Sequence, residues 1–176
     1  MATTVQPSPA GPPPGGDAVA AWTVVATKVY GTYGQDNAVI ALDQVSTAFG
    51  RGRFTAIMGP SGSGKSTLLH CLAGLDSLTS GQVFIAGQDL STMSDKQLTQ
   101  LRRDRIGFIF QAYNLVPTLT ALENIVLPAS LAGRKPDKAW LDQVVEAVSL
   151  GPRLGHKPNQ LSGGQQQRVA CARALA

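Results

Sequence analysis

The sequence has few cysteines and no long apolar run, and each shortage excludes a class of protein. Cys71 and Cys171 lie far apart, and neither has a Cys or His neighbour at metal-ligand spacing. This excludes a disulfide scaffold and a thiolate zinc site, and we expect both cysteines to be buried as small hydrophobic residues. No apolar run approaches the roughly 20 residues that a membrane-spanning helix needs. The N-terminus also lacks the basic leader and apolar stretch of a signal peptide.

Charge is scarce as well, since charged residues make up 15% and apolar residues 43% of the 176 residues. Together with a mean hydropathy of +0.02, this composition is typical of a soluble globular domain. The net charge is +4, but the basic residues are scattered, and the tightest group is Arg102, Arg103 and Arg105. A solvated helix face explains this group, so we expect no nucleic-acid partner.

The first part of the chain differs in composition from the rest. Residues 1–20 contain five of the eleven prolines, three glycines and a single charge, Asp17. Such a segment cannot bury enough surface to offset the entropy lost on ordering. The sequence therefore predicts a disordered tail over residues 1–21 and one domain over residues 22–176.

Within that domain, segments of strand and helix character alternate, which predicts an α/β fold. We expect strands over residues 22–30, 37–45, 53–58, 82–86 and 106–110. Capping signals and apolar spacing predict helices over residues 64–73, 94–105, 120–131, 136–149 and 162–176. Residues 53–58 are apolar throughout most of their length, so we expect a strand buried on both faces.

GPSGSGKST at residues 59–67 matches the phosphate-binding loop G-x-x-x-x-G-K-[ST] in full. Its glycines allow backbone N–H groups to turn inward around phosphates, and a helix N-terminus follows directly. Lys65 supplies a charge for the β- and γ-phosphates, and the Ser66 hydroxyl can ligate Mg²⁺. His70, on the same helix, is expected to have a packing role. The predicted nucleotide-binding loop consists of Gly59, Pro60, Ser61, Gly62, Ser63, Gly64, Lys65, Ser66 and Thr67.

Two further segments point to chemistry. LSGGQ at residues 161–165 begins a predicted helix, where backbone N–H groups and a hydroxyl can meet an anion, although Ser-Gly-Gly alone is usually a plain turn. Gln111 follows the predicted strand at residues 106–110, in a place suited to sensing a metal ion or water.

These three motifs, in this order and spacing, resemble the ATP-binding subunits of ABC transporters. Residues 114–124 and 156–164 are similar to the branch that contains macrolide exporters, lipoprotein-release systems and cell-division proteins. The resemblance implies a P-loop NTPase fold of the ABC type. Such a domain has a mixed sheet core, an antiparallel β subdomain and a helical subdomain, here at about residues 112–162.

The resemblance also implies roles for individual residues. Lys65 and Gln111 would act in catalysis, Ser66 and Gln111 would hold Mg²⁺, and Tyr30 or the nearby Tyr33 would stack on the adenine of ATP. The signature residues would contact the ATP of a second subunit in a head-to-tail dimer: Ser162, Gly163, Gly164 and Gln165. Residues 112–124 would face a membrane-embedded permease, which places the subunit at the cytoplasmic face of the plasma membrane.

The implied function is ATP-driven export of a lipoprotein, a peptide or a drug-like molecule. In the family, an acidic strand with an Mg²⁺-supporting Asp, a catalytic Glu and a switch His follow the signature helix, and none of them occurs in these 176 residues. We therefore expect a fold that is incomplete at its C-terminus and a chain that does not hydrolyse ATP alone. Two alternatives remain at this point. One is a non-transport ABC ATPase of DNA repair or translation, and the other is a nucleotide-binding module without turnover.

Overall fold

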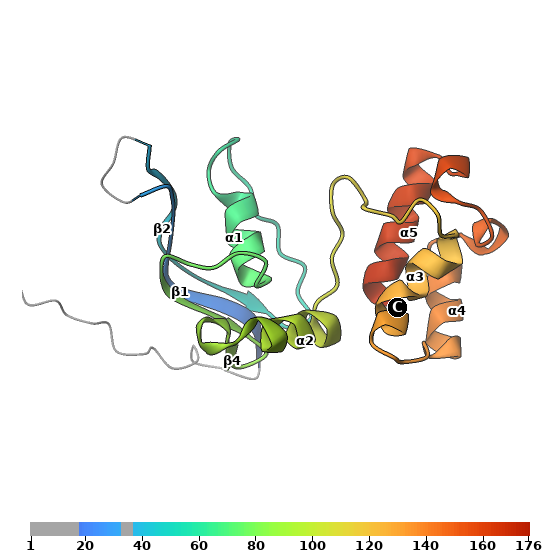
Figure 1. Ribbon diagram of the computed structural model, residues 1–176, viewed down its shortest axis with the longest axis horizontal. Helices are drawn as coiled ribbons and strands as arrows, with labels where there is room; N and C mark the ends of the chain where they lie inside the picture. Colours follow the sequence, from blue (N-terminus) through green and yellow to red (C-terminus); the bar gives the residue numbers. More distant parts are fainter. Residues whose placement is uncertain (1–17, 33–36) are drawn as a thin grey trace, which may run out of the picture. The chain divides into compact units, whose positions relative to one another are not determined.

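The computed structural model describes residues 18–32 and 37–176, and these form two compact units that divide between Leu98 and Thr99 (Figure 1). Most of the predicted tail and Tyr33 lie outside the described residues. The first strand begins at Val19, three residues before the predicted domain boundary. None of the helices in the described ranges is long and apolar enough to cross a membrane.

The first unit is an antiparallel sheet with one helix beside it. Its strands follow the order β2-β1-β3-β4 and are β1 (Val19–Tyr30), β2 (Val39–Gly50), β3 (Ser80–Ile85) and β4 (Gln88–Asp89). Helix α1 (Lys65–Leu72) contacts the first three strands, and a short turn η2 (Leu90–Thr92) follows β4. Trp22 of β1 is buried and stacks on Phe84 of β3, with ring centroids 4.6 Å apart. This pair joins neighbouring strands in the core of the unit.

Helix α2 (Asp95–Arg105) spans the boundary between the units, and the second unit is otherwise helical. It contains α3 (Ala121–Leu131), α4 (Lys138–Ala147), η3 (Gly151–Arg153), η4 (Pro158–Gln160) and α5 (Gly163–Leu175). Its core is a cluster of small and aliphatic side chains on α3, α4 and α5 and the turns between them. These residues are Ala121, Ile125, Val144, Val145, Leu150, Leu161, Val169 and Ala172.

The helices that follow Thr120 and Ser162 start where the sequence predicts, because a capping residue fixes each start. Thr120 and Ser162 each cap a helix and receive a reciprocal bond from Glu123 and Gln165 three positions on. The fourth predicted helix is shorter than expected, because Asp137 caps it by accepting a bond from the Trp140 N–H.

Two predicted strands do not form. Residues 53–58 and 106–110 are irregular, and the expected burial of the first segment is wrong, since Phe54 is fully exposed and Met58 is 86% exposed. A strand needs a neighbour that offers a complementary ladder of N–H and C=O groups. The four strands in the described part of the chain pair only with one another, so neither segment has such a neighbour.

The free cysteines agree in part with the prediction. Cys71 on α1 is buried, whereas Cys171 on α5 is only partly buried. Burial raises the pKa of the Cys71 thiol, the negative charge of Asp76 raises it further, and Lys28 opposes both effects. Cys71 is therefore a neutral thiol and behaves as a small apolar side chain.

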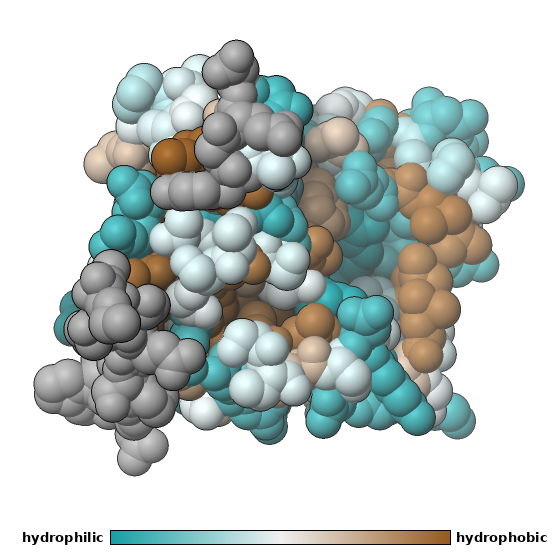
Figure 2. All heavy atoms as spheres, turned by 60° about the vertical axis from the view of Figure 1, so that its left-hand side comes forward, coloured by the Kyte–Doolittle hydropathy of each residue, from teal (hydrophilic) through white to brown (hydrophobic). Residues whose placement is uncertain are grey.

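Surface colouring by hydropathy shows hydrophobic patches lying among hydrophilic residues on the face in Figure 2. Large apolar side chains that are exposed in the described residues include Phe54, Met58, Ile109 and Leu131. Three of these belong to the predicted strands that do not form, and Leu131 belongs to the last turn of α3. Phe54, Met58 and Ile109 are exposed because the segments that contain them do not pair with a strand.

Ile125→Ala is expected to lower the free energy of unfolding of the second unit by about 3 kcal/mol, because it opens a cavity in the aliphatic core. Ile125 is fully buried, whereas Leu131 on the same helix is 77% exposed. The matched variant Leu131→Ala should therefore change stability by less than about 0.5 kcal/mol. Urea denaturation followed by circular dichroism measures both, and similar losses in the two variants would contradict the assigned core.

Candidate functional site

The predicted phosphate loop is an exposed turn that leads directly into α1. Gly62 and Gly64 have φ values of 80° and 83°, in the left-handed region that glycine tolerates best. A Cβ atom on Gly64 would lie 2.2 Å from the carbonyl oxygen of Ala41 on β2. Glycine at this position therefore allows both the turn and the close approach of the loop to β2.

Lys65 folds back over the loop that precedes it. Its ammonium nitrogen lies 2.9 Å from the carbonyl oxygen of Gly59, 2.6 Å from that of Pro60 and 3.3 Å from the hydroxyl oxygen of Ser63. Within residues 18–32 and 37–176, no carboxylate forms an ion pair with this group. The loop thus holds a positive charge whose protein partners are neutral oxygen atoms.

The N-terminus of α1 adds positive potential next to this charge. Gly64 occupies the N-cap position, and no side chain caps the first turn, which contains no acidic residue. Helix N-terminal N–H groups carry a partial positive charge and attract anions. Ser66 lies in this first turn and is exposed, so its hydroxyl is accessible from solvent.

His70 on α1 does not have the expected packing role, because its side chain is exposed. Its backbone carbonyl accepts hydrogen bonds from the N–H groups of Leu75 and Asp76, at 2.9 and 3.3 Å. The residue therefore contributes to the end of the helix through its backbone, a role that any residue can fill.

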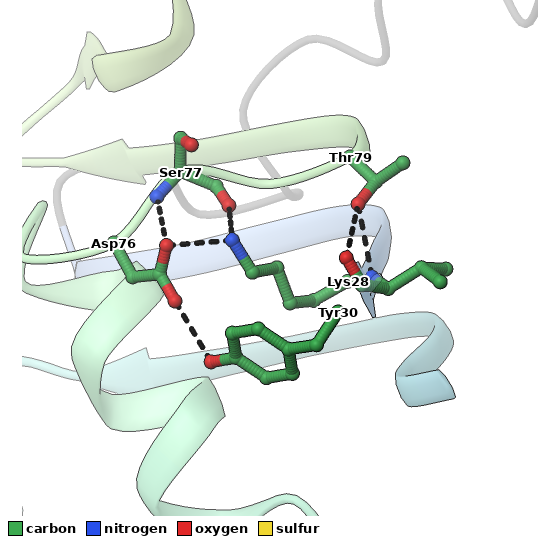
Figure 3. Close-up of polar contacts among 6 residues, drawn as sticks. Lys28, Tyr30, Asp76, Ser77 and Thr79 are labelled. Atoms are coloured by element: carbon green, nitrogen blue, oxygen red, sulfur yellow. Dashed lines mark hydrogen bonds and ion pairs between the residues drawn. The ribbon is translucent and has the colours of Figure 1, made fainter. Parts of the chain in front are cut away.

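Tyr30, the predicted adenine-stacking residue, lies at the end of β1 and is partly exposed. Its hydroxyl donates a 2.8 Å hydrogen bond to Asp76, which also forms a 2.6 Å ion pair with Lys28 (Figure 3). Burial raises the pKa of Asp76, but the hydrogen bonds from Lys28 and Tyr30 and the Lys28 charge outweigh this, so the pKa lies below its ordinary value. Asp76 is therefore ionised at neutral pH. No sequence pattern points to Lys28 and Asp76 as a pair, since their contact joins residues 48 positions apart.

Gln111 belongs to the second unit and is exposed in a turn after residues 106–110. Two residues that follow it, Tyr113 and Asn114, have φ values of 60° and 47°, which is uncommon for residues with a side chain. Arg173 of α5 donates hydrogen bonds to both of their carbonyl oxygens, at 2.7 and 2.6 Å. The Gln111 loop is thus attached to the helix that begins at the signature motif.

Asn124 organises the rest of this loop and was not singled out from the sequence as a site residue. It is fully buried on α3, accepts a hydrogen bond from the Val116 N–H, and donates to the carbonyls of Val116, Leu119 and Thr120. One amide side chain therefore fixes the path of residues 116–120, which lie in the segment predicted to face a permease.

The signature residues form the exposed N-terminus of α5. The Ser162 hydroxyl accepts a 3.3 Å bond from the Gln165 N–H, and the Gln165 side chain accepts a 2.8 Å bond from the Ser162 N–H. Neither Gly163 nor Gly164 has a positive φ, and a Cβ atom on either would meet nothing within 4 Å. The packing of this chain therefore does not require glycine at these two positions.

The predicted site residues thus fall into two groups, each described within its own unit. The first unit contains the phosphate loop and Tyr30, and the second contains Gln111 and the signature residues. The described residues include no group of three or more His, Cys, Asp and Glu side chains that could hold a metal ion. The predicted Mg²⁺ ligands, Ser66 and Gln111, are neither His, Cys, Asp nor Glu, so this finding does not concern them.

Gly64→Ala is expected to destabilise the first unit more than Gly62→Ala. A left-handed φ costs alanine about 1–2 kcal/mol at either position. Only at Gly64 does the added carbon also collide with backbone, whereas Gly62 has nothing within 4 Å. We expect the collision to add about 1–3 kcal/mol. Urea denaturation compares the two variants, and equal midpoints would refute the close packing of the loop on β2.

Comparison with known proteins places these features in a family. The family model described as ABC transporter matches residues 42–176. An uncharacterized ABC transporter ATP-binding protein of Thermotoga maritima is 56% identical over 140 residues, which cover 78% of this chain and 60% of that protein. The lipoprotein-releasing system ATP-binding protein LolD of Xylella fastidiosa is 52% identical over 128 residues, covering 72% of this chain and 53% of the relative.

Two further matches extend the comparison. The macrolide export ATP-binding/permease protein MacB of Marinobacter nauticus is 49% identical over 140 residues, covering 78% of this chain and 22% of that protein. A solved ATP-binding cassette of Methanocaldococcus jannaschii, described as a dimer bound to ADP and Pi, is similar with a TM-score of 0.79 and 43% identity, covering 89% of this chain and 69% of that chain.

These matches confirm the resemblance to the macrolide-export and lipoprotein-release branch and the ABC-type P-loop NTPase fold. The chain spans 60% of the length of the Thermotoga relative and about half that of the Xylella relative. Because the family match over residues 42–176 takes in most of the chain, including the phosphate loop and the signature helix, this protein belongs to the ABC transporter family.

Proposed function

We propose that this protein is the ATP-binding subunit of an ABC transporter and couples ATP binding and hydrolysis to export through a membrane permease. The observation that carries the proposal is the position of the Lys65 ammonium group. It lies over a glycine-rich loop with only neutral oxygen atoms within hydrogen-bond distance. A positive charge held by neutral acceptors attracts an anion, and the adjoining N-terminus of α1 attracts the same charge.

The loop residues bind the triphosphate in this proposal. The left-handed turns at Gly62 and Gly64 direct backbone N–H groups toward the phosphates, and Lys65 contacts the β- and γ-phosphate oxygens. Gln111 orients water or a metal ion near the γ-phosphate in this proposal. Tyr30 stacks on the adenine through the exposed part of its ring.

Mg²⁺ accompanies ATP in this proposal, and its charge would neutralise the phosphate oxygens during transfer of the γ-phosphoryl group. The hydroxyl of Ser66 and the side-chain oxygen of Gln111 are the ligands that this chain offers. Both are neutral oxygen donors, which Mg²⁺ accepts beside phosphate oxygens and water. Ser66 follows Lys65 directly in the first turn of α1, so it lies next to the phosphate loop.

The signature residues act on a second subunit. Ser162, Gly163, Gly164 and Gln165 approach the ATP bound by the partner in a head-to-tail dimer. The open space around both glycines supports this role, since their lack of a side chain leaves room for an approaching molecule rather than for this chain. The related cassette of M. jannaschii, described as dimeric, also supports it.

Residues 112–124 contact the permease, which places the subunit at the cytoplasmic face of the plasma membrane. Arg173 and Asn124 give this segment a defined shape. The names of the relatives, a lipoprotein-releasing system and a macrolide exporter, support a lipoprotein, a peptide or a drug-like molecule as the transported substrate.

Lys65→Ala is expected to weaken ATP binding at least about tenfold, because it removes the charge aimed at the phosphates. His70→Ala is the matched control, since His70 is exposed on the same helix and its side chain takes no part in the loop. Isothermal titration of the full-length subunit with ATP and Mg²⁺ measures both variants. Equal affinities would refute the assigned phosphate site.

Gly163→Arg is expected to leave ATP binding by the monomer unchanged and to prevent the ATP-dependent dimer, because a long side chain fills the space reserved for the partner's nucleotide. Gly155→Arg is the control, since Gly155 is also exposed with nothing within 4 Å of a Cβ atom and lies outside the signature. Size-exclusion chromatography of the full-length variants with a non-hydrolysable ATP analogue separates the two. Dimer formation by Gly163→Arg would refute the role in trans.

A further inference from the structure

A polar cluster ties the end of β1 to the segment that follows α1, and neither the phosphate loop nor the signature motif includes it (Figure 3). The ammonium group of Lys28 donates to Asp76 at 2.6 Å and to the carbonyl oxygen of Ser77 at 2.7 Å. The second carboxylate oxygen of Asp76 accepts the 2.8 Å bond from the Tyr30 hydroxyl. Thr79 completes the connection by accepting a 2.9 Å bond from the Val29 N–H. One carboxylate oxygen of Asp76 therefore accepts a hydrogen bond from Lys28 and the other accepts one from Tyr30.

The cluster is well protected on the lysine side and open on the tyrosine side. Lys28 is 9% exposed, whereas Tyr30 is 42% exposed. A largely buried ammonium group needs a partner charge, and Asp76 supplies it. Burial raises the pKa of Asp76, yet the bonds from Lys28 and Tyr30 hold it below its ordinary value, so the carboxylate keeps its charge.

Lys28 also lies against the ring of Tyr30. Its ammonium nitrogen lies over the ring, 4.9 Å from the centroid, within the range of a cation–π contact. The hydroxyl bond to Asp76 fixes the far end of the ring, and the backbone of β1 fixes the near end. The ring is thus held at both ends, and the exposed part of Tyr30 is the surface that an aromatic ligand can contact.

The position of Tyr30 suits a ligand that is also held by the phosphate loop. Tyr30 is the register partner of Val39 on β2, and Gly64 packs on the carbonyl of Ala41, two residues further along the same strand. Two residues of strand span about 7 Å. The end of the loop and the tyrosine ring therefore belong to the same end of the β1–β2 pair.

We propose that Lys28 and Asp76 are positioning residues that hold the ring of Tyr30 for stacking on the base of a bound nucleoside triphosphate. The inference rests on the proposed function, because it assumes that the phosphate loop binds that nucleotide. Base–aromatic stacking contributes a large part of binding when the ring is already fixed, since little conformational entropy is lost on contact. Neither Lys28 nor Asp76 contacts the nucleotide, and both act through Tyr30.

The experiment compares two ligands that share the phosphates and differ in the base. The full-length subunit is titrated with ATP and with inorganic tripolyphosphate, each with Mg²⁺, and its unfolding midpoint is measured in parallel. Tyr30→Phe keeps the ring but loses the bond to Asp76, and Asp76→Asn loses the charge that faces Lys28. We expect each to weaken ATP binding about threefold to tenfold and to leave tripolyphosphate binding unchanged. Asp76→Glu should restore most of the ATP affinity.

Ser91→Ala is the matched control, because the Ser91 hydroxyl also donates to an aspartate, Asp89, at 2.6 Å in the same unit. It should affect neither ligand. Equal weakening of ATP and tripolyphosphate in Tyr30→Phe and Asp76→Asn would overturn the positioning role, since it indicates a general loss of structure. Unchanged ATP binding in both variants would overturn it as well. If the unmodified subunit bound neither ligand, the proposed function itself would be refuted, and this outcome is distinct from the other two.

Discussion

The approach of Gly64 to the carbonyl of Ala41 is the constraint on which the first unit depends. It places the start of α1 against β2, and thereby fixes the phosphate loop relative to the β1–β2 pair. A side chain at this position would separate the two backbones, because the added carbon would overlap the carbonyl oxygen. The charge of Lys65 and the ring of Tyr30 keep their relation to one sheet edge only while this contact holds.

Local signals in the sequence predicted the helices well. A capping residue and its partner three positions on form their bonds within one turn, as at Thr120 with Glu123 and at Ser162 with Gln165, so neighbouring residues contain the whole signal. Strands depend on residues elsewhere in the chain. The apolar segment at residues 53–58 has strand character but finds no pairing partner in the described part of the chain, and its side chains stay exposed.

In the candidate site, too, local features were predictable from the sequence and contacts between distant residues were not. The pattern of glycines around Lys65 predicted a turn with left-handed residues, and Gly62 and Gly64 adopt it, because the requirement is local. The contacts that support the site were not predictable in this way. Lys28 meets Asp76 across 48 positions, and Arg173 meets Asn114 across 59, and such pairs leave no periodic pattern in a single sequence. The local turn of the candidate site was therefore predictable from the sequence, whereas the long-range contacts that support it were not.

The buried amide of Asn124 also couples its surroundings to one another. Its hydrogen bonds reach residues 116–120 from a helix that begins at Ala121, so the shape of the loop and the first turn of α3 depend on one another. Asn124 can leave its pocket only by breaking all four bonds together. Residues 116–120 and the start of α3 therefore open as one cooperative unit, and the Val116 amide hydrogen is released to solvent when that unit opens.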